Sequence, residues 1–468
     1  MLALLTACAG PGPGPSPEPG PTGLSDPGPS ESGGASARPP NVLLVVADEL
    51  GGDKVAAYGE HPDPPPTPTL DALAARGVLF RNAWAYDTCS PSRSALLTGR
   101  YGRRTGVGGN LSPESGAFEL PLRELTIPEV LATAPDAWAT SAIGKWHQSS
   151  FGSPSNLNHP GAQGFDWYAV TMGNLDENSD PHHPFSYFEW EEDLNGALGW
   201  VTTYATTHQV DQAIDRIAAM PEPWFLYLAF NAPHKPLTAP PPALDPVDPG
   251  PLVNEPRLYH AVVQALDTEL GRLLAEVDET DTVVLFVGDN GTPDHATLPP
   301  WDPAHAKETM FEGGVGVPLI VAGPPVAVPG SESAALVHVV DLFATVADLA
   351  GVDPTALVSE EQGPVPIDGQ SLVPFLRDPA APGREMVYTE HFRPLGVSAP
   401  RTSDQRAVRD ARFKLMVGEG GAESLFDLAG RSDDGPNLLD APLDPDAAAA
   451  YARLRAELDR YAVALVPY

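Results

Sequence analysis

Four apolar runs in the chain are each followed by charged, amide or imidazole side chains. The runs span residues 42–47, 138–143, 224–230 and 282–287, and the side chains that follow them are Asp48 and Glu49, Lys145 and His147, His234, and Asp289 and Asn290. Continuous apolar runs of this length are typical of buried parallel strands. Because ligands bind beyond the carboxyl ends of such strands, we expect these side chains to meet at one sheet edge. The lysine and the histidines would bind an oxyanion there, so the pattern predicts an active site.

Each of these groups also has an ordinary structural explanation. Asp48 and Glu49 would fit an acidic turn after a strand, Lys145 and His147 a solvated loop, and His234 a hydrogen-bonded loop. Taken singly, each basic residue would favour that explanation. Their meeting at one sheet edge, together with the acid–amide pair Asp289-Asn290 after another strand, favours a site.

Residues 89–100 (CSPSRSALLTGR) contain one of only two cysteines in the chain. Pro91 suits the first turn of a helix and Gly99 suits its end, so we expect Cys89 at or just before a helix N-terminus. That position stabilises a developing anion and lowers the pKa of a thiol. The alternative is a buried, inert cysteine. Arg93, one turn further on, favours an anion-binding role.

Helical patterns lie between the apolar runs. They cover residues 70–77, 262–274 and 339–350, and residues 317–322 form one more expected strand. Strands that alternate with helices favour an α/β fold, with a large, mainly parallel sheet sandwiched by helices. We assign residues 41–385 to this catalytic domain.

The pattern changes after about residue 385. Short strands are expected at 386–390, 405–409 and 413–417, and an amphipathic helix at 447–465. We therefore expect residues 386–468 to form a smaller C-terminal α+β subdomain, an antiparallel sheet plus one helix.

The chain is strongly acidic, with 62 Asp and Glu against 27 Lys and Arg and a formal net charge of −35 over 468 residues. Such a surface repels nucleic acid and anionic membranes, so we expect no nucleic-acid partner. It also disfavours densely charged polyanionic substrates.

The N-terminal residues differ in composition from the rest of the chain. Residues 5–8 (LTAC) resemble the lipobox of bacterial lipoprotein signals, although no positively charged segment precedes them. Residues 9–40 are rich in Pro, Gly and Ser and should form a disordered tether. We predict a truncated lipoprotein signal at 1–8 with a lipid anchor through Cys8. The protein would be exported in a bacterium to the cell surface or periplasm, or otherwise secreted. With both cysteines so explained, no disulfide is expected.

The cysteine segment resembles the signature of the sulfatases. That signature is Cys-x-Pro-Ser-Arg, three further residues, and Leu/Met-Thr-Gly-Arg, and every specified position is met here. Other similar segments extend over most of the chain: 40–49, 144–147 (GKWH), 232–234 (APH), 288–291 (GDNG), 307–318 (KETMFEGGVGVP), 368–372 and 426–428. The resemblance implies the fold of the alkaline phosphatase superfamily. It also implies that a formylglycine-generating enzyme oxidises Cys89 to formylglycine.

The resemblance implies a metal site as well. Its ligands would be Asp48, Glu49, Cys89, Asp289 and Asn290. The family usually has two consecutive aspartates after its first strand, and here the second is Glu49, whose side chain is one methylene longer. Hard oxygen ligands favour one divalent cation, Ca²⁺ or Mg²⁺.

The remaining roles also come from the resemblance. One hydroxyl of the hydrated formylglycine would attack sulfur, while Arg93 and Lys145 hold the sulfate oxygens. His234 and Lys307 would stabilise or protonate the leaving alcohol, and His147 would deprotonate the second hydroxyl to expel sulfate. Asp289 could assist the attacking hydroxyl. Apart from the resemblance, His305 lies close to Lys307 in the sequence and is left as a surface, core or substrate-rim residue.

The function predicted is thus hydrolysis of a sulfate ester, on a sulfated small molecule or saccharide. One alternative is a phosphate or phosphonate ester hydrolase of the same superfold. Another is a binding lipoprotein without turnover, although such a protein would have no use for a modification signal. Specificity should reside in loops such as residues 150–200 and 237–257.

Overall fold

The structure, a computed structural model, describes residues 38–111, 118–150, 153–177, 185–245, 254–359, 363–397 and 401–464. The predicted lipoprotein signal at 1–8, and the predicted tether up to residue 37, lie outside the described residues. Among the helices of the described part, none has both the length and the apolar character needed to cross a membrane.

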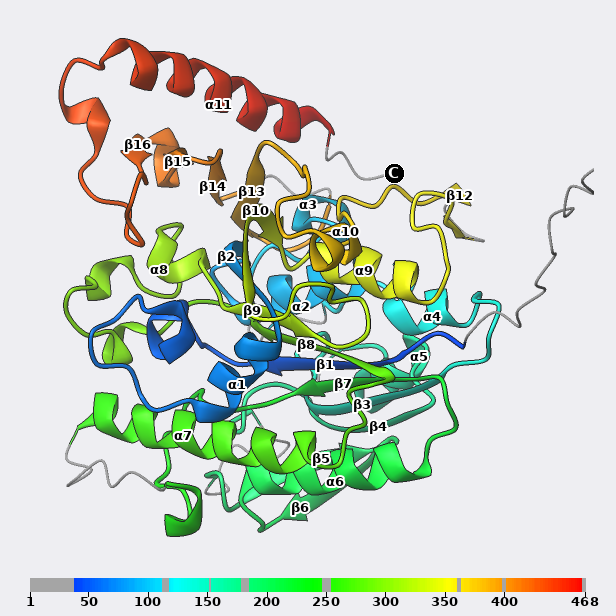
Figure 1. Ribbon diagram of the computed structural model, residues 1–468. Coiled ribbons are helices and arrows are strands. Elements are labelled where there is room, and N and C mark those ends of the chain that lie inside the picture. The colour runs from blue at the N-terminus through cyan, green and yellow to red at the C-terminus, as the bar shows by residue number, and fades with distance from the viewer. Residues whose placement is uncertain are drawn as a thin grey trace, which may run out of the picture. The chain divides into compact units, whose positions relative to one another are not determined.

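A ten-stranded sheet forms the middle layer of the fold (Figure 1). Its strands lie in the order β10-β2-β9-β8-β1-β7-β3-β4-β5-β6. Their bounds are β1 Asn41–Ala47, β2 Gly77–Trp84, β3 Ala139–Lys145, β4 Trp167–Thr171, β5 Trp190–Leu194, β6 Ala197–Val201, β7 Trp224–Ala229, β8 Thr282–Gly288, β9 Leu319–Ala322 and β10 Ser331–His338. The neighbours β8, β1, β7 and β3 run parallel, so the four apolar runs end at one edge, as predicted.

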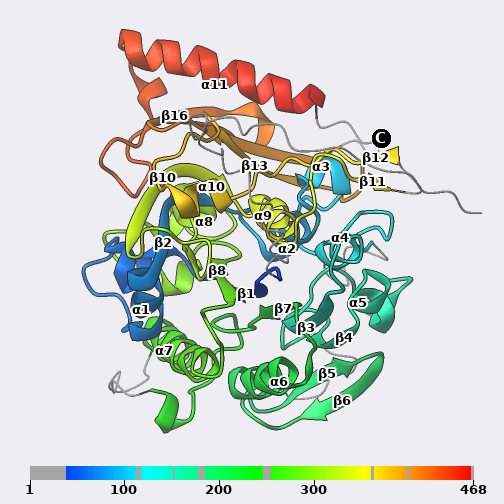
Figure 2. The same cartoon turned by 45° about the vertical axis from the view of Figure 1, so that its right-hand side comes forward.

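Helices cover both faces of the sheet, as Figure 2 shows. Strand β1 has alternate side chains in two different cores: Val42, Leu44 and Val46 pack on one face, and Leu43 and Val45 on the other. The first face is covered by α2 Cys89–Thr98, α4 Ile127–Leu131, α9 Asp341–Leu349 and α10 Val373–Arg377. The second is covered by α1 Pro68–Arg76, α6 Ala205–Ala219 and α7 Glu255–Leu274. Burial of strands on both sides explains why they are apolar throughout.

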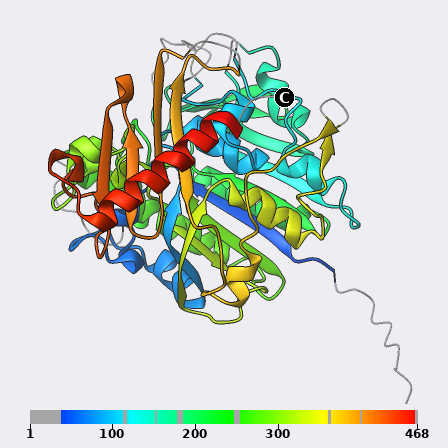
Figure 3. The same ribbon diagram turned by 90° about the horizontal axis from the view of Figure 1, so that it is seen from above.

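A second sheet, with four antiparallel strands, follows the main one. Its strands are β13 Val387–Arg393, β14 Ser403–Arg409, β15 Phe413–Val417 and β16 Glu423–Asp427, in sequence order. Helix α11, Pro445–Ala464, crosses this sheet in the view from above (Figure 3) and buries Leu454 and Leu458. The smaller elements are α3 Gly102–Thr105, α5 His159–Ala162, α8 Glu312–Val315, β11 Val358–Ser359 and β12 Gly363–Pro364. The predicted fold class, with its C-terminal antiparallel sheet and helix, is confirmed.

One boundary of the predicted elements is wrong. The helix expected at 70–77 ends at Arg76, and Gly77 begins β2 instead. A Cβ at Gly77 would lie 2.4 Å from the carbonyl oxygen of Val321, so close packing of β2 on β9 requires glycine there. The strand at 317–322 is present but runs antiparallel to both its neighbours. Strands β2, β4, β5, β6, β10 and β16 were not predicted, and some of them, such as β5 (WEEDL) and β16 (ESLFD), mix polar and apolar residues.

Candidate active site

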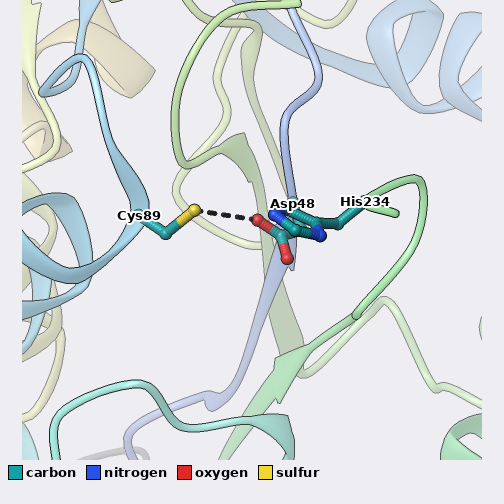
Figure 4. Close-up of side chains that lie close together, drawn as sticks. All are labelled: Asp48, Cys89 and His234. Atoms are coloured by element: carbon teal, nitrogen blue, oxygen red, sulfur yellow. Dashed lines mark hydrogen bonds between the residues drawn. The ribbon is translucent and has the colours of Figure 1, made fainter. Parts of the chain in front are cut away.

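Cys89 begins helix α2, as the positions of Pro91 and Gly99 predict. Thr88 precedes the helix, and Gly99 ends it with a φ of 69°, a left-handed conformation that favours glycine. The Cys89 side chain is fully buried and points toward the end of β1, where Figure 4 shows it facing Asp48. Its Sγ lies 3.2 Å from Asp48 Oδ1 and 3.7 Å from Asn290 Oδ1. Two strand ends and one helix terminus therefore meet at this thiol.

Buried oxygen atoms surround the thiol. Asp48, Asp289 and Asn290 expose at most 1% of their surface. Asp289 Oδ1 accepts hydrogen bonds from Asn290 Nδ2 at 2.6 Å and from the Glu49 amide at 3.0 Å. These bonds fix the acid–amide pair and leave the Asn290 oxygen directed at Cys89. Such a set of hard oxygen donors fits a hard divalent cation.

Two buried cations balance these carboxylates. Arg93 donates from Nε to Asp289 Oδ2 at 2.9 Å and from Nη1 to the Lys145 carbonyl at 2.8 Å. Lys145 Nζ lies 2.6 Å from Asp48 Oδ2. Burial alone would raise the pKa of Asp48, but Lys145, His234 and Arg93 together hold it well below its usual value. The site thus combines a carboxylate cluster with a basic cluster that can bind an oxyanion.

The carboxylate of Glu49 contacts His234 and Lys307, the two residues that the resemblance assigns to the leaving alcohol. Its Oε1 pairs with Lys307 Nζ and lies 2.9 Å from His234 Nε2. Burial would raise the pKa of Glu49, but His234 and Lys307 lower it to about 2. Its backbone has a φ of 66°, and its carbonyl accepts a 2.5 Å hydrogen bond from Tyr259. The metal-ligand role of Glu49 stays a prediction.

His147 and His234 have different hydrogen-bond partners. Nε2 of His147 lies 2.8 Å from the Leu111 carbonyl and must donate to it, while Nδ1 has no hydrogen-bond partner among the described residues. Burial, with Lys145 and Arg93, lowers the pKa of His147 well below its usual value. His147 is therefore a neutral imidazole with a free basic nitrogen. In His234, Nδ1 donates to the Lys235 carbonyl at 2.7 Å.

The structure brings together every residue predicted for the site: Asp48, Glu49, Cys89, Arg93, Lys145, His147, His234, Asp289, Asn290 and Lys307. The ligand atoms of Asp48, Cys89 and His234 lie within 4.8 Å of one another (Figure 4). His305 instead stacks on Phe311, with ring centroids 3.6 Å apart.

One expectation about Cys89 is wrong. The helix N-terminus was expected to lower the pKa of its thiol, but burial raises it well above its usual value, and the charges of Asp289 and Asp48 add to the increase. Desolvation outweighs the helix dipole here, because the Cys89 side chain is completely buried. An unmodified Cys89 would therefore be a poor nucleophile.

Sequence reasoning missed one pair of residues beside the site. Asn174 and Glu177 lie in the loop after β4, and the Asn174 side chain contacts Lys145 directly. The run Trp167–Thr171 ends just before Gly173 and Asn174 and was the signal that could have found them, although no motif marked either residue.

The model of the sulfatase family matches residues 40–352, which include all ten site residues. The chain belongs to the sulfatase family. This sulfatase is 30% identical to arylsulfatase G of Rattus norvegicus, over 90% of this chain and 83% of that protein. It is 31% identical to N-acetylgalactosamine-6-sulfatase of Homo sapiens, over 72% of this chain and 66% of that protein.

Solved structures agree with the fold of this sulfatase. The crystal structure of Ps i-CgsB has a TM-score of 0.74 and 25% identity, covering 91% of this chain and 93% of that one. A structure solved in complex with its substrate D-glucosamine-2-N,6-O-disulfate has a TM-score of 0.69 and 20% identity, covering 90% and 97%. The second likeness concerns the fold alone.

Proposed function

We propose that this sulfatase, a sulfuric ester hydrolase by family, cleaves its ester with a formylglycine made from Cys89 and with a divalent cation. The observation that carries the proposal is the meeting of Cys89 with Asp48 and Asn290 in a fully buried cluster that also holds Arg93 and Lys145. A buried thiol with a raised pKa would do little chemistry there. An aldehyde that hydrates to two hydroxyl groups would present nucleophilic oxygen where the sulfur now lies.

The two hydroxyls of such a hydrate explain why serine or cysteine would not serve. One forms the bond to sulfur as the alcohol leaves. The other then loses its proton, so that the carbon returns to the aldehyde and sulfate is expelled. His147, a neutral imidazole with a free Nδ1, is suited to take that proton.

The basic side chains divide between the two ends of the ester. Arg93 and Lys145 lie beside the nucleophile and would hold the sulfate oxygens as charge shifts onto them. His234 and Lys307 are the more accessible pair, with 15% and 8% of their side chains exposed. They would face the leaving alcohol and stabilise or protonate it.

Asp48, Asp289 and Asn290, with Glu49 as a further candidate, would hold the cation. Their all-oxygen chemistry favours Ca²⁺ or Mg²⁺. When bound, such a cation would act as a Lewis acid that stabilises negative charge on oxygen.

A sulfated saccharide is the substrate class that we propose. It is supported by the relative named N-acetylgalactosamine-6-sulfatase. The net charge of −35 favours a small or singly sulfated molecule over a heparin-like chain. Export with a lipid anchor at Cys8, and conversion of Cys89 by a formylglycine-generating enzyme, are part of the proposal.

Two measurements test this function. Mass spectrometry of the tryptic peptide 82–93 should show an aldehyde at position 89 in protein made with a converting enzyme. Rates on nitrophenyl sulfate, phosphate and phosphonate should then favour the sulfate. A clear preference for phosphate or phosphonate would instead identify an ester hydrolase of the alternative kind.

A further inference from the structure

The ammonium group of Lys145 has two fixed hydrogen-bond acceptors. Its Nζ lies 2.6 Å from Asp48 Oδ2 and 2.6 Å from Asn174 Oδ1, and the side chain is fully buried. An ammonium group has three hydrogens and no acceptor. With two hydrogens directed at these oxygens, the direction of the third is set by geometry.

The side-chain amide of Asn174 can adopt only one orientation. Its Oδ1 accepts from the Lys145 ammonium, and its Nδ2 donates to Glu177 Oε1 at 2.7 Å. A flipped amide would place an NH₂ group against the ammonium and an oxygen against the carboxylate, so both contacts would become repulsive. Glu177 therefore decides which atom of Asn174 faces Lys145.

The loop after β4 is built to hold Glu177 in this place. The Glu177 amide donates to the Asn174 carbonyl at 2.9 Å, which closes a turn between the two residues. A Cβ at Gly173 would lie 2.2 Å from Glu177 Oε2. The Glu177 carboxylate therefore occupies the space that a side chain at position 173 would need. Thr171 Oγ1 donates to the Gly173 carbonyl at 2.9 Å and ties this turn to the end of the strand.

We propose that Asn174 and Glu177 are positioning residues for Lys145. Glu177 fixes the orientation of the Asn174 amide, and the Asn174 oxygen gives the Lys145 ammonium a second acceptor besides Asp48. With two N–H groups held in this way, the third N–H of Lys145 is directed to a sulfate oxygen of the substrate. The role depends on the hydrogen bond that Glu177 accepts and not on its charge. The inference rests on the proposed function, because it assumes that Lys145 binds the sulfate group.

Two conservative variants separate the hydrogen bond from the charge. Glu177→Gln keeps an acceptor oxygen at the same reach and loses the charge, so its kcat/KM for a sulfate ester should stay within about threefold of wild type. Glu177→Asp keeps the charge but is one methylene too short, so its kcat/KM should fall about tenfold or more. Asp176→Ala, which removes the neighbouring exposed carboxylate, is the matched control and should leave activity unchanged.

Three further readouts distinguish positioning from a merely structural effect. Glu177→Asp should weaken inhibition by inorganic sulfate by a similar factor, and its loss should be equal for esters with good and poor leaving groups. Its melting temperature and metal content should match wild type. In a double-mutant cycle, Glu177→Asp should cost nothing further once Asn174→Ala has been made.

The opposite ranking, with Glu177→Asp active and Glu177→Gln impaired, would overturn the proposal in favour of a charge effect. Equal activity of all variants, or additive losses in the cycle, would also overturn it. If the wild-type protein with formylglycine turned over no sulfate ester, the proposed function itself would fail instead.

Discussion

Glu49 Oε1 is shared by the two residues that face the leaving group, because it pairs with Lys307 Nζ and lies 2.9 Å from His234 Nε2. All three side chains come from different segments, after β1, after β7 and after β8. The extra methylene of Glu49, compared with the aspartate usual in the family, gives the carboxylate a longer reach from β1. One acidic residue thus holds two basic side chains in fixed positions beside each other.

Glu49→Gln should therefore destabilise the fold. It would leave the buried Lys307 ammonium without its counter-charge, and breaking a buried ion pair on one side costs about 3–5 kcal/mol. Chemical denaturation should show a loss of this order in the free energy of unfolding. Asp433→Asn, which breaks the exposed pair with Arg431, is the control and should change it by less than about 1 kcal/mol. A Glu49→Gln protein as stable as wild type would show that the Lys307 ammonium does not depend on Glu49 as its counter-charge.

Chelation should abolish activity, and Ca²⁺ or Mg²⁺ should restore it. The buried oxygens of Asp48, Asp289 and Asn290 have the hardness and the convergence that these ions need. Asp289→Ala should lose both bound metal, measured by elemental analysis, and turnover, by at least about 10²-fold. Glu276→Ala, which removes an exposed carboxylate just after α7, should keep both. Full activity of chelator-treated, dialysed protein would refute the metal site.

His234 and His147 should fail in different ways. His234→Ala should slow esters with poor leaving groups by about 10²-fold or more, and nitrophenyl sulfate much less, because nitrophenolate needs no proton. His147→Ala should instead accumulate a sulfated enzyme, visible as an added sulfate mass on peptide 82–93. The same leaving-group dependence in both variants, with no added mass, would show that these roles are assigned wrongly.

Much of the site was predictable because its residues follow regular elements. The four apolar runs form neighbouring parallel strands, so Asp48, Lys145, His234 and Asp289 meet at one sheet edge. The Pro91 and Gly99 signals placed Cys89 correctly at the start of α2. These are short-range patterns, and the topology of a parallel sheet converts them into long-range contacts.

Side-chain contacts between loops could not be predicted from the sequence. Asn174 reaches Lys145 from a loop without any periodic pattern, and the partners of Glu49 depend on the reach of one methylene. The raised pKa of Cys89 likewise follows from complete burial between two carboxylates. Propensity and spacing carry no information on such desolvation.

The chemistry of residue 89 is tested most directly by counting hydroxyl groups. Cys89→Ala has none, so it should bind metal and substrate but show no turnover. Cys89→Ser, if left unconverted, has one hydroxyl, which would attack sulfur slowly and form a sulfate ester that no second hydroxyl can expel. Intact-protein mass spectrometry should then show a stable adduct that is heavier by one SO₃ unit.

Wild-type protein gives the matching comparison, because its activity should follow the converted fraction of Cys89. Made in a host without a converting enzyme, it should fold with the same melting temperature, keep its thiol and be nearly inactive. The buried thiol, with its raised pKa, offers no thiolate to replace the aldehyde. A fully active preparation in which peptide 82–93 carries only unmodified cysteine would contradict the mechanism, and a Cys89→Ser variant with sustained turnover would do the same.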